Sequence, residues 1–196
     1  MKEGKIIILS APSGSGKSSI IRRLMEIADL CLGFSVSATS RKPRGDERDG
    51  VEYYFLSEKE FKERAERGEF VEWEEVYPGT CYGTLLSEVT RVTHAGRNLI
   101  MDVDVKGALN IKEFFGEKAL ALFIMPPSKE ELEKRLRSRS TDSEDSILKR
   151  LAKADFEMGF APKFDDVVVN DNLEAAVNKT ASLIRGFSGI EEDKAE

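Results

Sequence analysis

The segment from Ser10 to Ser19 reads SAPSGSGKSS and combines glycines, serines and one lysine at a spacing suited to binding phosphate. In a phosphate-binding loop, successive backbone N–H groups surround a phosphate at a helix N-terminus, and glycines permit the backbone angles this needs. Lys17 would bridge the β- and γ-phosphates, and the Ser18 hydroxyl would ligate Mg²⁺. Phosphate-binding loops have the pattern G-x-x-x-x-G-K-[ST], and this sequence departs from it only at Ala11, which replaces the first glycine. That change matters only if position 11 needs a positive φ.

The alternative interpretation of this loop is an ordinary Gly/Ser turn followed by a solvated lysine. A cation at a helix N-terminus opposes the helix macrodipole, so a lysine at position 17 is a poor structural choice. An apolar, strand-like run precedes the loop, and an amphipathic helical pattern follows it. The sequence therefore predicts a nucleoside triphosphate site here.

Two arginines three residues apart, Arg41 and Arg44, form a second candidate anion site, and Pro43 stiffens the link between them. Guanidinium groups on a short turn suit bidentate binding of a phosphate, to which Tyr53 and Tyr82 could donate. Taken alone, such a segment is more often a solvated loop in which charges pair with one another. The carboxylates available for that pairing are Asp46, Glu47 and Asp49.

The elements that must position these residues are indicated by four short apolar runs, at 6–10, 99–105, 119–125 and 166–170. Strands buried on both faces read this way, and they are typical of a parallel sheet covered by helices. Amphipathic patterns fall between the runs, and one begins with Ser128 as N-cap and Glu131 three residues later, a capping box. The alternation predicts an α/β fold with a doubly wound parallel sheet.

Between 34 and 97 the pattern changes to short segments punctuated by Pro and Gly. FSVSATS (34–40) and GVEYYFLS (50–57) are interpreted as strands, EKEFKERAERGEF (58–70) as a helix and YPGTCYGT (77–84) as a turn. We expect a small mixed α/β subdomain inserted over the nucleotide site.

The domain division that we expect has four parts. They are a core of 1–33, 98–136 and 148–190, an insertion at 34–97, a short helical lid at 137–147, and a frayed polar tail at 191–196.

The composition is that of a folded protein of 196 residues with 36 acidic and 30 basic residues, and its net charge is −6. This balance argues against bulk affinity for nucleic acid or for an anionic membrane. Cys31 and Cys81 provide no disulfide framework, and no signal-peptide pattern is visible. The apolar runs are too short to span a bilayer. We therefore expect a cytoplasmic protein without a membrane or nucleic-acid partner.

Several motifs together resemble those of the guanylate kinases. S-x-S-A-T-S-R-K-P-R (35–44), followed by Glu47, Gly50, Tyr53 and Phe55, resembles the GMP-binding segment of that family. EFVEWEEV…YGT and LIMDVDVKGALNIK resemble the next two motifs, PPSKEELEKRLRSRSTDSED with RLAKADFEM resembles the lid, and VVVNDNLEAA resembles the last strand and turn. The match covers essentially the whole chain in the family's order. It implies transfer of the γ-phosphoryl group of ATP to GMP, giving ADP and GDP.

By position, the resemblance also implies how GMP is bound. Arg41, Arg44, Tyr53 and Tyr82 would hold its phosphate, Ser37, Glu72, Thr84 and Asp104 would read guanine, and Glu47 and Gly83 belong to the same site. The chemistry agrees, because guanine offers N1–H and N2–H₂ donors to carboxylates and adenine lacks both. dGMP is a possible further substrate.

The ATP site implied by the resemblance comprises Ala11, Pro12, Ser13, Gly14, Ser15, Gly16, Lys17, Ser18, Ser19 and Asn170. Mg²⁺ would accompany ATP, held by Ser18 and by Asp102 in the manner of a Walker-B acid. Strand alternation would put Asp102 and Asp104 on the same side. Lys17, Arg135, Arg139 and Arg150 would be the catalytic residues. Read alone, the arginine-rich helix is more often a solvated face.

Catalysis at such a site is positioning plus charge neutralisation, because a phosphate oxygen of GMP is already ionised and needs no general base. The only histidine, His94, is expected at the surface. Ser40, Asp46 and Ser140 depart from the family's usual residues, and their effect is left open. Two rivals remain: a P-loop kinase acting on AMP, dTMP or UMP, and a scaffold domain that binds proteins instead of GMP. The oligomeric state is left open.

Overall fold

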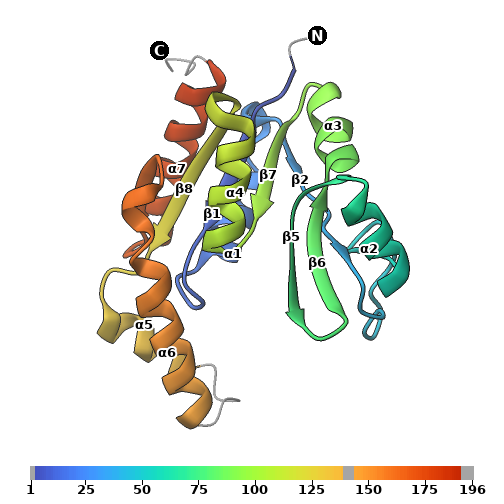
Figure 1. Ribbon diagram of the computed structural model, residues 1–196. Helices are drawn as coiled ribbons and strands as arrows, with labels where there is room; N and C mark the ends of the chain where they lie inside the picture. The colour runs from blue at the N-terminus through green and yellow to red at the C-terminus, as the bar shows by residue number, and fades with distance from the viewer. Residues whose placement is uncertain (1–2, 139–143, 191–196) are drawn as a thin grey trace.

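A five-stranded parallel sheet forms the centre of the molecule (Figure 1). The structure is a computed structural model and describes residues 3–138 and 144–190. The strands lie in the order β2-β7-β1-β8-β9. Their bounds are Leu32–Phe34 for β2, Asn98–Asp102 for β7, Ile6–Ser10 for β1, Ala119–Met125 for β8 and Asp166–Val169 for β9. All four predicted strands are confirmed. The second is shorter than predicted, because Asp104 already serves as the N-cap of the next helix.

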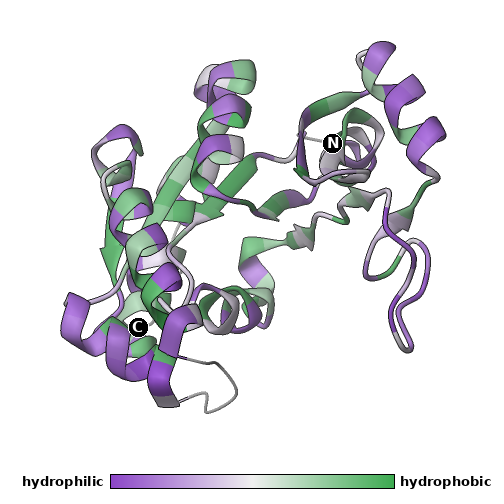
Figure 2. Ribbon diagram, turned by 60° about the horizontal axis from the view of Figure 1, so that its bottom comes forward, coloured by the Kyte–Doolittle hydropathy of each residue, from purple (hydrophilic) through white to green (hydrophobic). Residues whose placement is uncertain are grey.

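Helices cover both faces of this sheet, so the predicted three-layer α/β fold is confirmed. Ile7 and Leu9 pack against α1 (Lys17–Met25) and α7 (Leu173–Ser188), whereas Ile6 and Ile8 pack toward α3 (Leu86–His94) and α4 (Val105–Phe115). Neighbouring residues of a strand point to opposite faces, which is why one apolar run supplies two cores. Figure 2 shows the hydrophobic strands between helices whose outer surfaces are hydrophilic.

Beyond the carboxyl ends of these strands lie α5 (Lys129–Ser138) and α6 (Glu144–Met158), which pack through Leu132, Leu136 and Ala154 (Figure 1). The Ser128 hydroxyl accepts a hydrogen bond from Glu131 N at 3.1 Å, so the predicted N-cap is confirmed. The Glu131 carboxylate accepts from Arg135 instead of completing the capping box. Short 3₁₀ turns occupy Ala28–Leu30, Gly116–Lys118 and Ala161–Lys163.

A second, mixed sheet lies within the expected insertion and has the order β4-β3-β6-β5. Its elements are β3 (Ala38–Thr39), β4 (Tyr54–Phe55), α2 (Glu58–Glu66), β5 (Phe70–Tyr77) and β6 (Thr80–Leu85). Phe61 of α2 and Phe70 stack at 4.4 Å between ring centroids and form its small core with Cys81 and Leu85. The insertion therefore has a hydrophobic core of its own.

Several local predictions in this region are wrong. The segment 34–40 is not one strand: Phe34 ends β2 in the main sheet, and only Ala38–Thr39 joins the second sheet. The helix predicted over 58–70 ends at Glu66, because Gly68 takes a left-handed φ of +68° that ends the helix. The predicted strand at 50–57 shortens to Tyr54–Phe55, and the predicted turn at 77–84 is mostly β6, with only Pro78 and Gly79 between the strands.

Glu88 of α3 joins the two sheets. Its side chain is 1% exposed and accepts hydrogen bonds from Val36 N at 3.0 Å, from Tyr54 Oη at 2.9 Å and from the Arg91 guanidinium. Helix α3 lies inside the expected insertion, yet Val89 and Val92 belong to the main core. The division at 34 and 97 stays a prediction. Within the described ranges, no helix is both long and apolar enough to cross a membrane.

Candidate active site

The loop from Ala11 to Gly16 connects β1 to α1 and has the backbone of a phosphate-binding loop. Gly14 and Gly16 have φ values of +96° and +90°, which favour glycine. Among the described residues, Cys31 is the only non-glycine with a positive φ, so Ala11 is unstrained. The alanine at the first motif position therefore does not distort the loop.

Lys17 begins α1, and its side chain is 17% exposed, so it is not the solvated charge of the alternative interpretation. Its ammonium forms an ion pair with Asp102 at the end of β7 and donates to Val103 O at 3.2 Å. Asp102 is adjacent because β7 pairs with β1 in the sheet. Asp102 also lines one pocket with Ser18, so the two expected metal ligands lie in the same pocket.

Asn170, which follows β9, fastens the phosphate loop from the other side. Its Nδ2 donates to Ser15 O at 2.6 Å, and its backbone oxygen accepts from both terminal nitrogens of Arg135, at 3.2 Å each. A Cβ atom on Gly16 would lie only 2.3 Å from Asn170 Nδ2. A side chain at position 16 would thus have to displace the Asn170 amide, in addition to adopting a positive φ.

Helices α5 and α6 also reach the phosphate loop. Arg150 of α6 donates to Ser13 Oγ at 2.6 Å. Gly14, Ser19, Arg135 and Asn170 line a further pocket beside the loop. Arg139, Ser140 and the middle of the expected lid lie outside the described residues. The structure thus brings Arg135 and Arg150 to the predicted ATP site.

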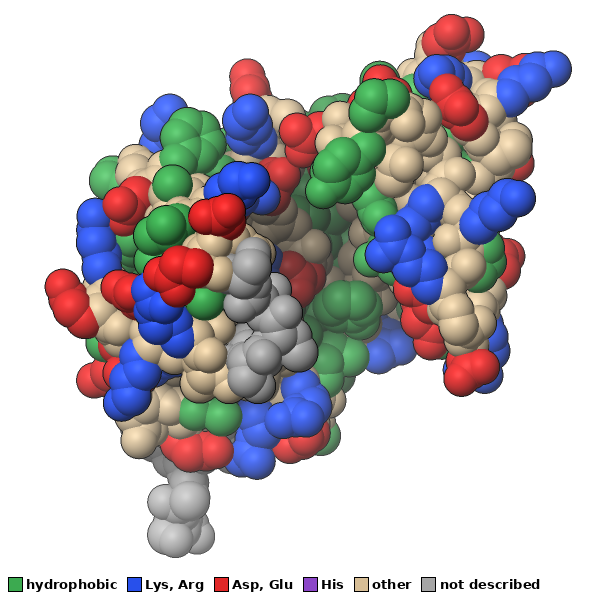
Figure 3. Space-filling view, turned by 90° about the horizontal axis from the view of Figure 1, so that it is seen from below, with side chains coloured by type: hydrophobic (Ala, Val, Ile, Leu, Met, Phe, Trp, Pro, Cys, Tyr) green, Lys and Arg blue, Asp and Glu red, His purple; other side chains and the backbone are tan. Residues whose placement is uncertain are grey.

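Two pockets share one wall, formed by Asp102, Val103 and Asp104. The first pocket lies over the phosphate loop and the second against the mixed sheet. In Figure 3 the molecule is hollowed between its two lobes, and acidic side chains lie in the hollow. The two aspartates expected on one side therefore line the same two pockets, although Asp104 lies beyond the strand, where its carboxylate accepts from Gly107 N at 2.8 Å.

The second pocket contains most of the residues expected to bind GMP. They are Ser37, Tyr53, Glu72, Tyr82, Gly83 and Asp104. Thr84 lies behind Glu72 and donates to its Oε1 at 3.0 Å. Burial raises the pKa of the Glu72 carboxyl, the Thr84 hydrogen bond lowers it, and the charge of Asp104 raises it further. A Cβ on Gly83 would lie 2.7 Å from Glu72 O, so glycine lets the two strands approach.

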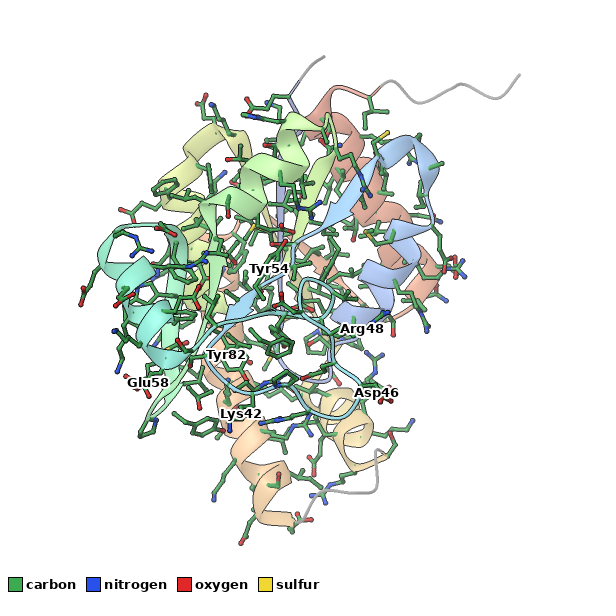
Figure 4. The ribbon with its side chains drawn as sticks, turned by 90° about the vertical axis from the view of Figure 1, so that its right-hand side faces the viewer. Lys42, Asp46, Arg48, Tyr54, Glu58 and Tyr82 are labelled. Carbon is green, nitrogen blue, oxygen red and sulfur yellow. The ribbon has the colours of Figure 1, made fainter. Side chains whose placement is uncertain are left out.

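Arg41 lies beside this pocket and is held by a carboxylate. Its terminal nitrogens donate to Glu47 Oε2 at 2.6 Å and Oε1 at 2.8 Å, and its Nε donates to Tyr82 Oη at 3.1 Å. The guanidinium also packs 4.8 Å from the Tyr53 ring centroid. Figure 4 shows the loop with Lys42, Asp46 and Arg48 along it and Tyr82 nearby. Hydrogen bonds from Arg41 and from Arg44 N lower the pKa of Glu47 to about 2.

The charge pairing expected of a solvated loop is present in this arginine segment, and the phosphate site stays a prediction. Arg41 pairs with Glu47, as in a charged loop, and it also bonds Tyr82, which lines the second pocket. Arg44 donates its backbone N–H to Glu47 Oε2 at 2.8 Å, and its side chain is outside the pocket lining. Ser40 ties the segment to the β5–β6 hairpin through Gly79 O and Cys81 N.

Glu157 of α6 is a site residue that sequence reasoning missed. It lines the pocket over the phosphate loop, although its side chain is only 8% exposed. Within the motif RLAKADFEM it looks like one more charge on a solvated helix. The available signal was its spacing of seven from Arg150, which puts both side chains on one helix face. His94 is exposed, as predicted.

The donors in the loop pocket suit Mg²⁺. No group of three or more His, Cys, Asp or Glu that could hold a metal occurs in the described chain. Mg²⁺ does not need such a cage, because it keeps several waters and takes one or two protein oxygens together with substrate phosphates. The Ser18 hydroxyl and the Asp102 carboxylate are oxygen donors of this kind.

Comparisons with known proteins agree with one another. A family model described as "Guanylate kinase" matches residues 3–186. Proteins named guanylate kinase from Bacteroides fragilis and Porphyromonas gingivalis are 53% and 54% identical, over 96% and 93% of this chain and 92% and 97% of their own. A crystal structure of guanylate kinase from Anaplasma phagocytophilum is similar with a TM-score of 0.73 and 29% identity, covering 98% of this chain and 89% of its own.

Proposed function

This chain belongs to the guanylate kinase family, and from that premise we propose how its residues transfer the γ-phosphoryl group of ATP to GMP. The observation that carries the proposal is the wall of Asp102, Val103 and Asp104 between two pockets. ATP phosphates would occupy the pocket at the loop, and GMP would occupy the other. Two substrates on either side of one short wall have their reacting phosphates close together, which is the main contribution available to a phosphoryl transferase.

On the ATP side, the Lys17 ammonium would exchange its contact with Asp102 for the β- and γ-phosphates. That exchange leaves the Asp102 carboxylate and the Ser18 hydroxyl to hold Mg²⁺. When bound, Mg²⁺ would neutralise part of the negative charge of the nucleotide phosphates. Arg135 and Arg150 already contact the loop region through Asn170 and Ser13, and they would add positive charge near the transferring group. Arg139 keeps its proposed role on the family resemblance alone.

On the GMP side, Glu72 and Asp104 would accept the N1–H and N2–H₂ donors of guanine, and Ser37 would donate to its O6. The Thr84 hydroxyl fixes one oxygen of Glu72 and leaves the other to the base. Adenine would leave these acceptors unpaired, and hydrogen-bonding sites of this kind discriminate by about 10⁴-fold. The site therefore favours guanine over adenine.

At the GMP phosphate, we propose that Glu47 positions Arg41 rather than touching the substrate, because two anions repel each other. A guanidinium has five N–H groups, and Arg41 makes four hydrogen bonds, two to Glu47 and one each to Lys42 O and Tyr82 Oη. One N–H group and the Tyr82 hydroxyl then remain for a phosphate. Tyr53 and Arg44 would complete the clamp.

A coupled assay of ADP release tests the substrate assignment, with GMP, dGMP, AMP, dTMP and UMP as acceptors in parallel. We expect turnover with GMP and at least about 10³-fold lower kcat/KM with AMP. Faster turnover with AMP, dTMP or UMP would favour the rival kinases, and GMP binding without any turnover would favour the scaffold. We also propose a cytoplasmic location, supported by two free thiols, one of them exposed, which a reducing compartment would preserve.

A further inference from the structure

Helix α6 presents two charged side chains to the phosphate-loop pocket. Arg150 donates to Ser13 Oγ at 2.6 Å, and Glu157 lines the pocket together with Lys17, Asp102 and Asp104. Seven residues span nearly two helical turns, so both side chains lie on the same face of α6. Arg150 has a ready explanation, because a cation suits a polyphosphate site. Glu157 is an anion at the same site, so its presence there needs a different explanation.

The Glu157 side chain is buried and incompletely paired. It is 8% exposed, its Oε1 lies 3.7 Å from Lys153 Nζ, and its Oε2 is a buried atom without a hydrogen-bond partner in the described part of the chain. Burial raises the pKa of this carboxyl, against the charges of Lys153 and Lys17. A buried polar atom without a partner costs free energy of folding. Glu157 is therefore difficult to explain as a contribution to stability.

The charges around Glu157 restrict which donors its carboxylate can accept from. The Lys17 ammonium is already engaged by Asp102 and Val103 O. Phosphates carry only acceptors and negative charge, so they would repel an ionised carboxylate. Water molecules bound to a divalent cation are strong hydrogen-bond donors, and Mg²⁺ in nucleotide sites keeps several of them. A metal-bound water is the partner that fits both the charge and the missing donor.

We propose that Glu157 positions the nucleotide-bound divalent cation by accepting a hydrogen bond at its carboxylate from a water on that cation. This inference rests on the proposed function, because it needs Mg²⁺ with ATP at Ser18 and Asp102. Glu157 acts through the water and not as a direct ligand, so it is a positioning residue. The same ion would then be held by side chains from two elements, Asp102 at the end of β7 and Glu157 on helix α6.

The experiment uses Mn²⁺ as the probe and ADP as the nucleotide. The Mn²⁺ dissociation constant of the protein–ADP complex is measured by electron paramagnetic resonance for wild type, Glu157→Gln and Glu157→Asp. Asp155→Asn is the matched control, because it removes an acidic charge from the same helix at an exposed position paired with Lys129. The ADP dissociation constant in EDTA is measured for all four proteins, together with thermal unfolding.

We expect Glu157→Gln and Glu157→Asp to weaken Mn²⁺ binding by about 10-fold or more, as is typical when a metal loses an outer-shell partner. Glu157→Gln removes the charge, and Glu157→Asp keeps it but withdraws the carboxylate by one methylene. Asp155→Asn should stay within about 2-fold of wild type. ADP binding in EDTA should be unchanged or tighter in the Glu157 variants, because a negative charge near the phosphates is removed or withdrawn.

Equal Mn²⁺ affinity in wild type and both Glu157 variants would overturn the inference. It would also be overturned if ADP binding in EDTA weakened as much as Mn²⁺ binding, since Glu157 would then shape the loop and not the cation site. Unfolding of Glu157→Gln at lower temperature than Asp155→Asn would indicate a structural role and count against it. A failure of the proposed function is recognised by a different result: the wild-type protein itself would form no Mn²⁺–ADP complex or would produce no GDP.

Discussion

Replacing Gly16 with alanine tests how tightly the phosphate loop is held by Asn170. The new methyl group would lie 2.3 Å from Asn170 Nδ2, at a residue whose φ is +90°. A left-handed backbone costs a non-glycine residue about 1–2 kcal/mol. Displacing Asn170 removes its hydrogen bond to Ser15 O, a loss of about 1–3 kcal/mol for a buried carbonyl. We therefore expect Gly16→Ala to lower the free energy of unfolding by roughly 2–5 kcal/mol.

Urea unfolding followed by far-UV circular dichroism measures this loss. Gly68→Ala is the control, because Gly68 has a φ of +68° but no atom within 4 Å of the added Cβ. It should cost only the backbone part, about 1–2 kcal/mol. In an Asn170→Ala background the obstacle is gone, so Gly16→Ala should cost no more than the control. A double-mutant cycle should thus give a coupling of about 1–3 kcal/mol.

Equal losses for Gly16→Ala and Gly68→Ala would refute the packing argument. Strict additivity of Gly16→Ala and Asn170→Ala would refute it as well, since the two groups would then not compete for space. In either case the glycine at position 16 would be needed for its φ alone.

Three further predictions concern the charged residues. Lys17→Ala should lower kcat by about 10²–10³-fold. Its unfolding temperature should change little, because the partner Asp102 is 32% exposed and can be solvated. Retained turnover would reject the catalytic role of the lysine. Arg41→Ala should raise the KM for GMP by about 10–100-fold, because one charged hydrogen bond contributes about 1.5–3 kcal/mol. An unchanged KM would show that Arg41 does not bind the GMP phosphate. Glu88→Gln should cost about 1–3 kcal/mol of stability at pH 7. Burial raises the pKa of Glu88, but the hydrogen bonds it accepts outweigh this and hold the pKa below 4.5, its ordinary value. The stability that ionised Glu88 contributes is therefore complete above pH 4.5 and is lost as the pH falls below it. In urea titrations, the difference in the free energy of unfolding between wild type and Glu88→Gln should narrow as the pH falls from 4.5. A difference that stays constant down to pH 3 would contradict this.

The main sheet could be predicted from the sequence because its strands are buried on both faces. A run such as IIILS has few other stable environments, and the loop that follows β1 has fixed glycine and lysine positions. The second sheet was less predictable. Its strands are short and half-exposed, and FSVSATS divides between two sheets, which no local alternation can reveal. Such a division is set by tertiary contacts, including the hydrogen bond from Val36 N to Glu88.

The candidate site was predictable where residue type and spacing carry the chemistry, as for Lys17, Arg41 and the two wall aspartates. It was not predictable where a role depends on a partner far away in the sequence. Glu157 looks like part of a solvated helix until its burial is known. Burial of a single charged side chain leaves no periodic pattern in a sequence.

The two crossings between the sheets, at 35–37 and at Leu85–Leu86, lie at the same end of the mixed sheet, and Glu88 is bonded beside both (Figure 1). The β5–β6 hairpin tip lies at the opposite end, and Val71 near the start of β5 packs against the core that contains α4. The mixed sheet is thus held to the main body at one end, and the hydrogen bonds of Glu88 to Val36 N and Tyr54 Oη fix its placement there. Substitutions in α3, which contributes no residue to the lining of the two pockets, are therefore expected to change how firmly the sheet that carries Tyr82 is held in place.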